Sequence, residues 1–295
     1  MTRHLLSLFL IGILTISTCG RDVLKEAQGI LDVGFRRSNA PSSVRYNQTI
    51  SFSLYTDQAS FLQNLSTYKL EPGGSETLIH SLNNPPAEVS YPFSYTPTLE
   101  DAGKRLMFVV RATTNSNNRV ASHTYTVRIL PLPNFISGQA TLSNVVSVNN
   151  ENVFLSLDHD RLTSYRLSDG ELFRADIGLI INNSSQIKLI SPHWFTSFSP
   201  LTIPGLSNPR NTYFGTGFPV DQNAFNNLNT TLELIRNINR QSGRFSGLSQ
   251  QTINAQVNDV IGFRAQSGRR GYILINAIDS ASNTATISIK EEPAL

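Results

Sequence analysis

The amino-acid sequence alternates between apolar and polar residues over much of its length, which is the pattern of half-buried β-strands. In residues 49–55, the apolar side chains Ile50, Phe52 and Leu54 take every second position, and hydroxyl-bearing residues take the others. Successive side chains of a strand point to opposite faces of a sheet, so this segment predicts an antiparallel strand with one buried face. Six or seven short strands of this kind between residues 29 and 131 predict a β-sandwich.

Residues 134–295 carry a second set of apolar runs of strand length. Residues 175–181 and 186–190 predict a hairpin, and the runs 257–265, 271–278 and 284–290 predict a three-stranded meander. One helix capped by Asp221 is expected between them, since apolar residues recur there at steps of three and four: Phe225, Leu228, Leu232, Ile235 and Ile238. The sequence therefore predicts a mainly β protein, with a second β-sandwich or jelly-roll-like domain whose short helix covers an open end.

The two halves meet at Pro131-Leu132-Pro133. Each proline lacks a backbone donor, so neither can continue the hydrogen-bond ladder of the preceding strand. We expect the domain boundary at this stiff, extended segment.

The first residues have the form of a secretory signal. Arg3 precedes the mostly apolar run 5–16, which is too short to cross a bilayer as a stable helix. The end of that run, residues 15–20, resembles the bacterial lipobox, although Thr18 stands where that motif usually has Gly, Ala or Ser. The resemblance implies a lipoprotein signal peptide over 1–18, a diacylglycerol on Cys19 and a short tether over 19–28. The alternative is an ordinary signal peptide that leaves Cys19 as a free thiol.

The composition is that of a globular chain, with 39% apolar and 15% charged residues. The net charge of +3 falls to +2 once Arg3 is removed with the signal peptide, and it gives little attraction to nucleic acid, which we do not expect as a partner. Acylation of Cys19, the one cysteine of the chain, would leave no thiol for a disulfide, a nucleophile or a Cys-ligated metal.

Two further segments carry resemblances to known families. Asp101-Ala102-Gly103, before the apolar run 106–110, is similar to the E–F corner of immunoglobulin-like (Ig-like) domains, with Arg105 where tyrosine is usual. The disulfide cysteines are missing, so the resemblance is to bacterial Ig-like modules, which serve as spacers or adhesive units. The strand after Asp176 and the segment 257–263 resemble C-terminal domains of exported Bacteroidota lipoproteins. That resemblance implies an outer-membrane lipid anchor, with display at the cell surface left open, and it favours a binding role.

Few residues suggest catalysis or metal binding. The sequence contains neither Gly-x-Ser-x-Gly nor His-Glu-x-x-His, and we predict that the protein is not an enzyme. A polysaccharide hydrolase that uses a distant carboxylate pair is a less favoured alternative. Asp158, Asp160 and Glu171 leave a Ca²⁺ site open, against a solvated strand edge, and we expect no other cofactor.

The strongest candidate binding segment is residues 191–219, which we expect to be a long irregular loop. It holds the only tryptophan, Trp194, and several aromatic side chains that no strand or helix periodicity buries. An exposed aromatic ring can stack on a sugar, and neighbouring polar groups can bond to hydroxyls. The predicted ligand-binding residues are Trp194, Tyr213, Phe214, Arg210 and Asn211. The alternative is that the segment folds back over its own sandwich.

These observations together predict a lipid-anchored cell-envelope binding protein that captures an extracellular glycan through its C-terminal domain. The alternative is a structural or adhesive envelope component whose partner is another protein.

Overall fold

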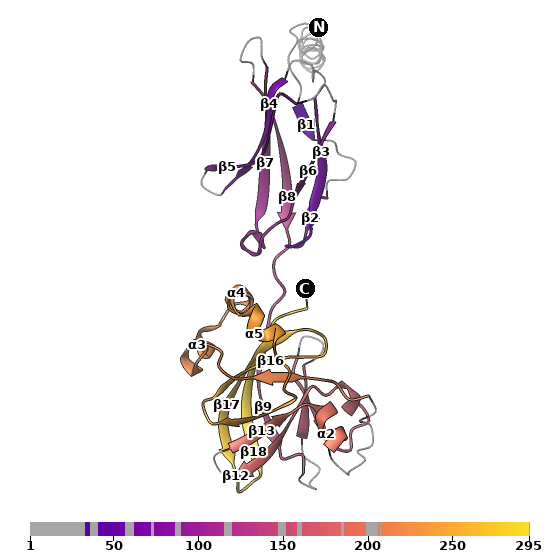
Figure 1. Cartoon of the computed structure of the whole chain (residues 1–295), viewed down its shortest axis with the longest axis vertical. Coiled ribbons are helices and arrows are strands. Elements are labelled where there is room, and N and C mark those ends of the chain that lie inside the picture. Colours follow the sequence, from indigo (N-terminus) through magenta and orange to yellow (C-terminus); the bar gives the residue numbers. More distant parts are fainter. Residues whose placement is uncertain are drawn as a thin grey trace, which may run out of the picture. The chain divides into compact units, whose positions relative to one another are not determined.

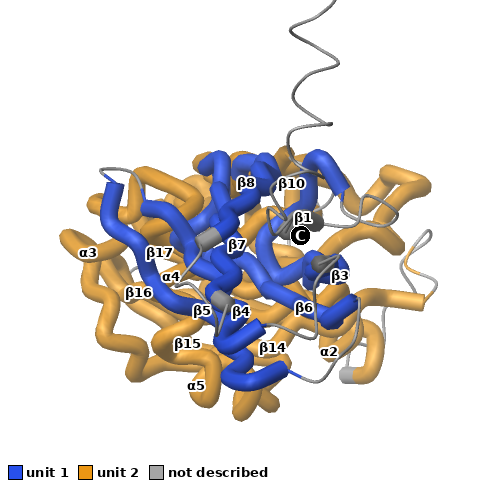
Figure 2. Tube along the Cα trace, turned by 90° about the horizontal axis from the view of Figure 1, so that it is seen from above, with its two compact units in different colours: residues 1–131 blue, residues 132–295 orange. Residues whose placement is uncertain are grey.

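The computed structural model describes residues 33–35, 41–56, 62–71, 74–85, 90–114, 120–146, 152–157, 161–183, 186–198, 206 and 208–294. The expected signal peptide, Cys19 and tether lie outside these residues. The chain divides into two compact units, residues 1–131 and 132–295, which Figure 2 distinguishes by colour. The division falls within the Pro131-Leu132-Pro133 segment. Both units are mainly β, as the sequence predicts.

Unit 1 is a sandwich of two sheets (Figure 1). The smaller sheet has the order β1-β3-β6, formed by Val33–Phe35, Ile50–Thr56 and Ser90–Tyr95. The larger has the order β2-β8-β7-β4-β5, formed by Ser43–Val44, Val120–Ile129, Arg105–Thr114, Leu62–Leu70 and Glu76–Asn83. The short strand β2 runs parallel to β8, and the other pairs are antiparallel. This arrangement is that of an Ig-like sandwich.

Aromatic contacts fill the space between the two sheets of unit 1. Strands β3 and β7 are the two that a disulfide joins in antibody domains. Here Phe52 of β3 and Phe108 of β7 take part in the contact between the sheets, with ring centroids 6.0 Å apart. Phe93 of β6 lies 4.5 Å from Phe52, and all three side chains are buried. Packing of aromatic rings thus joins the sheets of a domain that lacks the bridging cysteines.

The turn before β7 is built around the buried carboxylate of Asp101. Its Oδ1 accepts a hydrogen bond from Lys69 Nζ at 2.7 Å, and its Oδ2 accepts from Tyr95 Oη and from the backbone N–H of Thr98, both at 2.9 Å. Burial raises the pKa of the Asp101 carboxyl, but the bonds from Lys69, Thr98 and Tyr95 outweigh it and hold the pKa below its ordinary value. One carboxylate therefore joins β4, β6 and the turn that starts β7.

Unit 2 is a second sandwich, of two five-stranded antiparallel sheets. The first sheet has the order β11-β10-β12-β13-β15, formed by Thr163–Arg166, Asn152–Ser156, Ile177–Asn183, Gln186–Ile190 and Thr252–Gln256. The second has the order β14-β16-β17-β18-β9, formed by Tyr213–Gly215, Val260–Arg264, Arg270–Asp279, Thr284–Glu291 and Ile136–Ser143. The expected hairpin is β12–β13, and the expected meander is β16–β17–β18.

The inner faces of the two sheets share one apolar core. Alternate residues of β12 and β13, such as Leu179 and Leu189, meet Ile273, Ile275 and Ile287 from the opposite sheet. The first strand of the unit, β9, pairs with the last, β18, over eight register positions. Both ends of the unit are thereby held in the same sheet.

Helices cover the outer face of the sheet that contains β17. Where the sequence predicts one helix over an open end, the structure has α3 (Gln222–Asn227), α4 (Thr231–Arg240) and α5 (Ser242–Ser246), which Figure 1 labels. Their apolar side chains pack around Tyr272 and Leu274 of β17. Asp221 caps α3, as predicted, because its Oδ1 accepts from Ala224 N at 2.7 Å. Thr230 and Glu233 form a capping box that starts a separate helix, α4.

We predict that Asp101→Asn destabilises unit 1 by about 3 kcal/mol, since it removes the buried charged partner of the Lys69 ammonium and leaves only the more exposed Glu71 carboxylate beside it. Urea unfolding with hydrogen exchange of β6 and β7 peptides measures the loss. Glu76→Gln is the control, because it removes a more exposed ion pair with Arg111 and is expected to cost less than about 1 kcal/mol. Equal effects of the two variants would contradict a central role for Asp101.

The same carboxylate predicts a dependence of stability on pH. The pKa of Asp101 is lower in the folded than in the unfolded chain, so its contribution is complete above the unfolded pKa of about 3.9. This contribution is lost as the pH falls from the unfolded-state pKa through the lower pKa of Asp101 in the folded chain. Unit 1 of the wild type should therefore lose more stability between pH 5 and pH 2 than unit 1 of Asp101→Asn.

Candidate functional site

Trp194 lies on a short helix, which corrects the expectation of an irregular segment over 191–219. After β13 the chain enters α2 (Pro192–Phe198), whose first residue is a proline, a favoured residue at that position. Phe195 of this helix is buried against Phe154, with ring centroids 6.2 Å apart. Trp194 packs against the same apolar cluster but is only partly buried. The helix therefore holds one aromatic side chain in the core and its neighbour at the surface.

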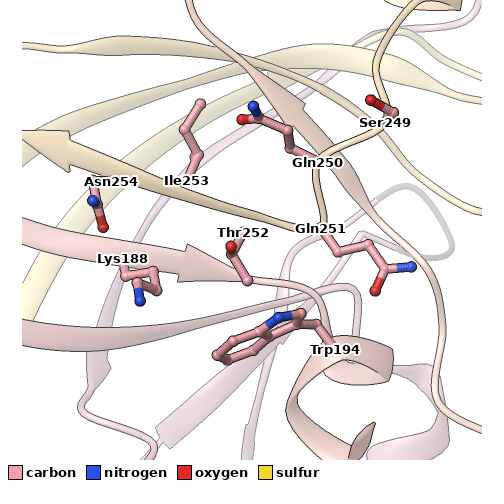
Figure 3. Close-up of a pocket in the computed structure, with 8 residues that line it drawn as sticks. All are labelled: Lys188, Trp194, Ser249, Gln250, Gln251, Thr252, Ile253 and Asn254. Atoms are coloured by element: carbon pink, nitrogen blue, oxygen red, sulfur yellow. The ribbon is translucent and has the colours of Figure 1, made fainter. Parts of the chain in front are cut away.

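Trp194 borders an open depression of about 620 Å³. The depression is lined by Lys188 of β13, by Ser249, Gln250 and Gln251, and by Thr252, Ile253 and Asn254 of β15. Figure 3 shows the indole at one side of it, with Lys188, Thr252 and Gln251 around the ring. One aromatic ring thus faces a wall of hydroxyl, amide and ammonium groups.

The pairing of β13 with β15 produces this polar wall. Leu189 and Ala255 point into the core, so the alternate residues of each strand point outward. Lys188 stands opposite Asn254, and Ile190 stands opposite Thr252. Strand β15 is the last of its sheet. The outward side chains therefore lie at a sheet edge, next to α2.

Lys188 and Trp194 interact directly. The Nζ atom of Lys188 lies 5.7 Å from the centroid of the Trp194 ring system, within the range of a cation–π contact. Lys188 carries the one formal charge among the described residues that line the depression. The ammonium therefore lies over the ring, and the depression combines a positive charge with an apolar surface.

Hydrogen bonds fix the backbone on both sides of the depression. Gln251 accepts from the backbone N–H of Ser191 at 2.8 Å, just before α2. Its side-chain Nε2 donates to Asn211 Oδ1, also at 2.8 Å. Gln250 accepts from the backbone N–H of Phe214 at 2.7 Å. The start of α2, the segment before β14 and the start of β15 are thus bound together.

Of the residues predicted to bind a ligand, Arg210 and Asn211 are not among those that line the depression. The Arg210 carbonyl accepts from Ser191 Oγ at 3.0 Å and from His193 N at 3.2 Å. The Arg210 guanidinium lies 3.5 Å from Asp176, whose buried Oδ2 also accepts from Leu157 N at 2.8 Å. Arg210 is therefore held by contacts within the fold, and Asn211 bonds to Gln251, which lines the depression.

Tyr213 and Phe214 lie on β14, in the opposite sheet from Lys188. Phe214 is 1% exposed and belongs to the inner core, so it cannot contact a ligand, and this corrects its expected role. Tyr213 points to the other face of β14, with the Arg264 guanidinium 5.3 Å from its ring centroid. The structure therefore does not bring Tyr213 or Phe214 together with Trp194.

Sequence reasoning missed Lys188, Gln250, Thr252 and Asn254. The alternation within 186–190 and 252–256 places Lys188, Thr252 and Asn254 on the outward faces of two strands. The sequence therefore contained the information that these side chains point outward. The pairing of two strands more than sixty residues apart in the chain was not visible.

The expected Ca²⁺ site falls largely outside the described residues, since Asp158 and Asp160 are not among them. The Glu171 carboxylate is exposed and lies 3.5 Å from Arg174. Within the described ranges, no three His, Cys, Asp or Glu residues are grouped as metal ligands. In the same ranges, no helix has the length and apolar character needed to cross a membrane.

Comparisons with known proteins place no function on this chain. No family model matches it, and no curated protein matches it. Among solved structures, it is similar to a DUF4466 family protein from Parabacteroides merdae, with 14% sequence identity and a TM-score of 0.37. That likeness covers 90% of this chain and 99% of the other. The fold described above rests on the sheets of this chain itself.

We predict that Lys188→Gln lowers quenching of Trp194 fluorescence by iodide about twofold, because one positive charge near the indole raises the local iodide concentration at low salt. Quenching by neutral acrylamide should not change. The control is Arg161→Gln, which removes an exposed charge next to β11, at the opposite edge of the same sheet. Equal iodide quenching in the wild type and Lys188→Gln would place the ammonium away from the indole.

Proposed function

We propose that this protein is an exported, lipid-anchored cell-envelope protein that binds an extracellular glycan through unit 2, without chemical turnover. The observation that supports this most directly is the partial exposure of Trp194 beside the polar depression. Other aromatic side chains of the same segment, Phe195, Phe214 and Phe218, are buried. Tyr213 is also partly exposed but lies in the opposite sheet, so Trp194 is the partly exposed ring of this segment that borders the depression.

The chemistry of the depression suits a sugar. The face of a pyranose that carries axial C–H groups is apolar and stacks on an aromatic ring, and its rim carries hydroxyls. The indole offers the stacking surface. The amide and hydroxyl side chains of the depression can each donate and accept hydrogen bonds, and so can the hydroxyls of a sugar.

The side chains that would contact those hydroxyls are available to a ligand. The side chains of Ser249, Gln250 and Asn254 are exposed, and that of Thr252 is half-buried. No hydrogen bond from these four side chains to another described residue is found, so a ligand can bond to them without breaking a contact of the fold. Gln251 keeps its bond to Asn211 and leaves its amide oxygen as an acceptor.

The anchor completes the proposal. A diacylglycerol on Cys19 would hold the chain at the outer membrane, and unit 1 would act as a spacer between the membrane and the glycan-binding unit. The lipobox-like sequence and the Ig-like sandwich of unit 1 support this arrangement.

A second candidate function is adhesion to another protein, which the outer face of the larger sheet of unit 1 favours. Leu78 of β5 is 54% exposed, and its partner in register on β4 is Tyr68. Tyr68 in turn stands opposite Val109 of β7. Apolar side chains on a solvent-facing sheet surface are typical of a protein contact.

Native gels cast with a panel of soluble polysaccharides test glycan binding. We expect at least one polysaccharide to retard the full-length chain. Trp194→Ala should weaken the affinity for that polysaccharide about 30-fold, because loss of a tryptophan that the ligand covers costs about 2 kcal/mol of binding free energy. Phe173→Ala is the matched control, because Phe173 is 41% exposed in the same unit but does not line the depression. Absence of retardation by every polysaccharide would favour the protein-adhesion alternative, and equal binding by Trp194→Ala would reject this site.

Metabolic labelling tests the anchor separately. Cells that express the full-length chain and are fed a labelled fatty acid should incorporate label into the wild type. Cys19→Ala, which lacks the sulfur that carries diacylglycerol, should incorporate none and should leave the membrane fraction. Ser17→Ala, which keeps Cys19, is the control. Label in Cys19→Ala would contradict lipidation at this position.

A further inference from the structure

We propose that the sugar bound at Trp194 is anionic, with a carboxylate or sulfate that pairs with Lys188. This inference rests on the glycan-binding function proposed above and names the class of glycan. The first observation is the position of the Lys188 ammonium. Its Nζ lies 5.7 Å from the centroid of the Trp194 ring system. A pyranose stacked on the indole brings an acidic substituent beside this ammonium.

The second observation is that the charge of Lys188 is uncompensated. Its cross-strand neighbours are Ile180 on β12 and Asn254 on β15, and neither is charged. No carboxylate among the described residues lies within ion-pairing distance of its Nζ. By contrast, several other basic residues each pair with an acid of their own unit: Lys69 and Arg111 in unit 1, and Arg269 and Arg270 in unit 2. Lys188 therefore has a charge available to a ligand.

The third observation concerns what surrounds that charge. The other described residues that line the depression are neutral, and each polar one can donate a hydrogen bond. The outward positions beyond Lys188 and Asn254, which are Gln186 and Gln256, are also amides. An anionic ligand therefore meets no carboxylate of the lining that would repel it.

The contact between Lys188 and the indole does not compete strongly with such a ligand. At exposed sites a cation–π contact and an ion pair stabilise by similar amounts, each less than about 1 kcal/mol, so exchanging one for the other costs little. Lys188 also has four rotatable side-chain bonds, so its ammonium can turn from the ring to an acid of the bound sugar. The indole then stacks on the apolar face of the sugar, and the Lys188 ammonium pairs with the acidic substituent.

Matched pairs of polymers separate the charge of the ligand from its shape. We would measure affinity of the full-length chain for polygalacturonate, alginate and hyaluronan, each beside its carboxyl-reduced form, in which CH₂OH replaces the carboxylate. Dextran sulfate beside dextran tests the sulfate. We expect at least one acidic polymer to bind about tenfold more tightly than its neutral partner. The pair that shows the preference identifies the acidic group.

Three variants assign this preference to Lys188. Lys188→Gln should bind the acidic and the neutral partner of each pair alike, whereas Lys188→Arg should retain the preference for the acidic one. Arg161→Gln makes the same change in charge at the far edge of the sheet and should leave the preference intact. Added salt should weaken acidic binding by the wild type more than by Lys188→Gln.

The outcomes distinguish the two proposals. If neutral polymers bind as well as acidic ones, and Trp194→Ala removes that binding, the anionic class is wrong and the glycan-binding function stands. If Lys188→Gln keeps the tenfold preference, Lys188 is not the partner of the acid and this inference fails. If no polymer binds, both proposals fail.

Discussion

The structure of unit 2 depends on burial of apolar side chains in three layers. One layer fills the space between the two sheets, a second lies under α3, α4 and α5, and a third lies under α2. Each sheet therefore has apolar side chains on both faces over much of its area. The third layer includes Ile180 and Ile190 but ends there, and the next outward positions are Lys188, Thr252 and Asn254. The depression lies where the cover of this sheet stops, which explains why it has an apolar ring at one side and polar groups at the other.

The segment that carries Trp194 is held from behind by polar contacts. Ser191 is fully buried, and its hydroxyl donates to the carbonyl of Arg210 and accepts from Thr212 N. The buried carboxylate of Asp176 receives both Leu157 N and the Arg210 guanidinium. Buried polar groups of this kind fix one arrangement, since an unpaired member costs more than a paired one gains. The orientation of α2, and with it the position of the indole, follows from these contacts.

The sequence was sufficient for the β class, the hairpin β12–β13 and the meander β16–β17–β18, because local alternation and turn residues define them. It did not separate α3 from α4, although Thr230 and Glu233 have the spacing of a capping box that starts a second helix. It identified Trp194 but grouped it with Tyr213 and Phe214, which lie in the other sheet. The residues that line the depression beside Trp194 could not be predicted. The pairing of β13 with β15 that brings them together joins segments distant in the chain and depends on the core between the sheets.

The residues that would meet a ligand are different from those that hold the site. The side chains of Lys188, Gln250 and Asn254 make no described hydrogen bond to the buried network, although the Gln250 backbone carbonyl accepts from Phe214 N. Substitutions of such surface side chains usually change stability by less than about 0.5 kcal/mol. Asp176, Ser191 and Arg210 form that network, so their loss would move α2 as a whole. The ligand preference of this face can therefore vary with a few exposed side chains while the sandwich stays the same. Of these, the charge at Lys188 has the longest reach, because charge interactions extend farther than hydrogen bonds and ring stacking, which need direct contact.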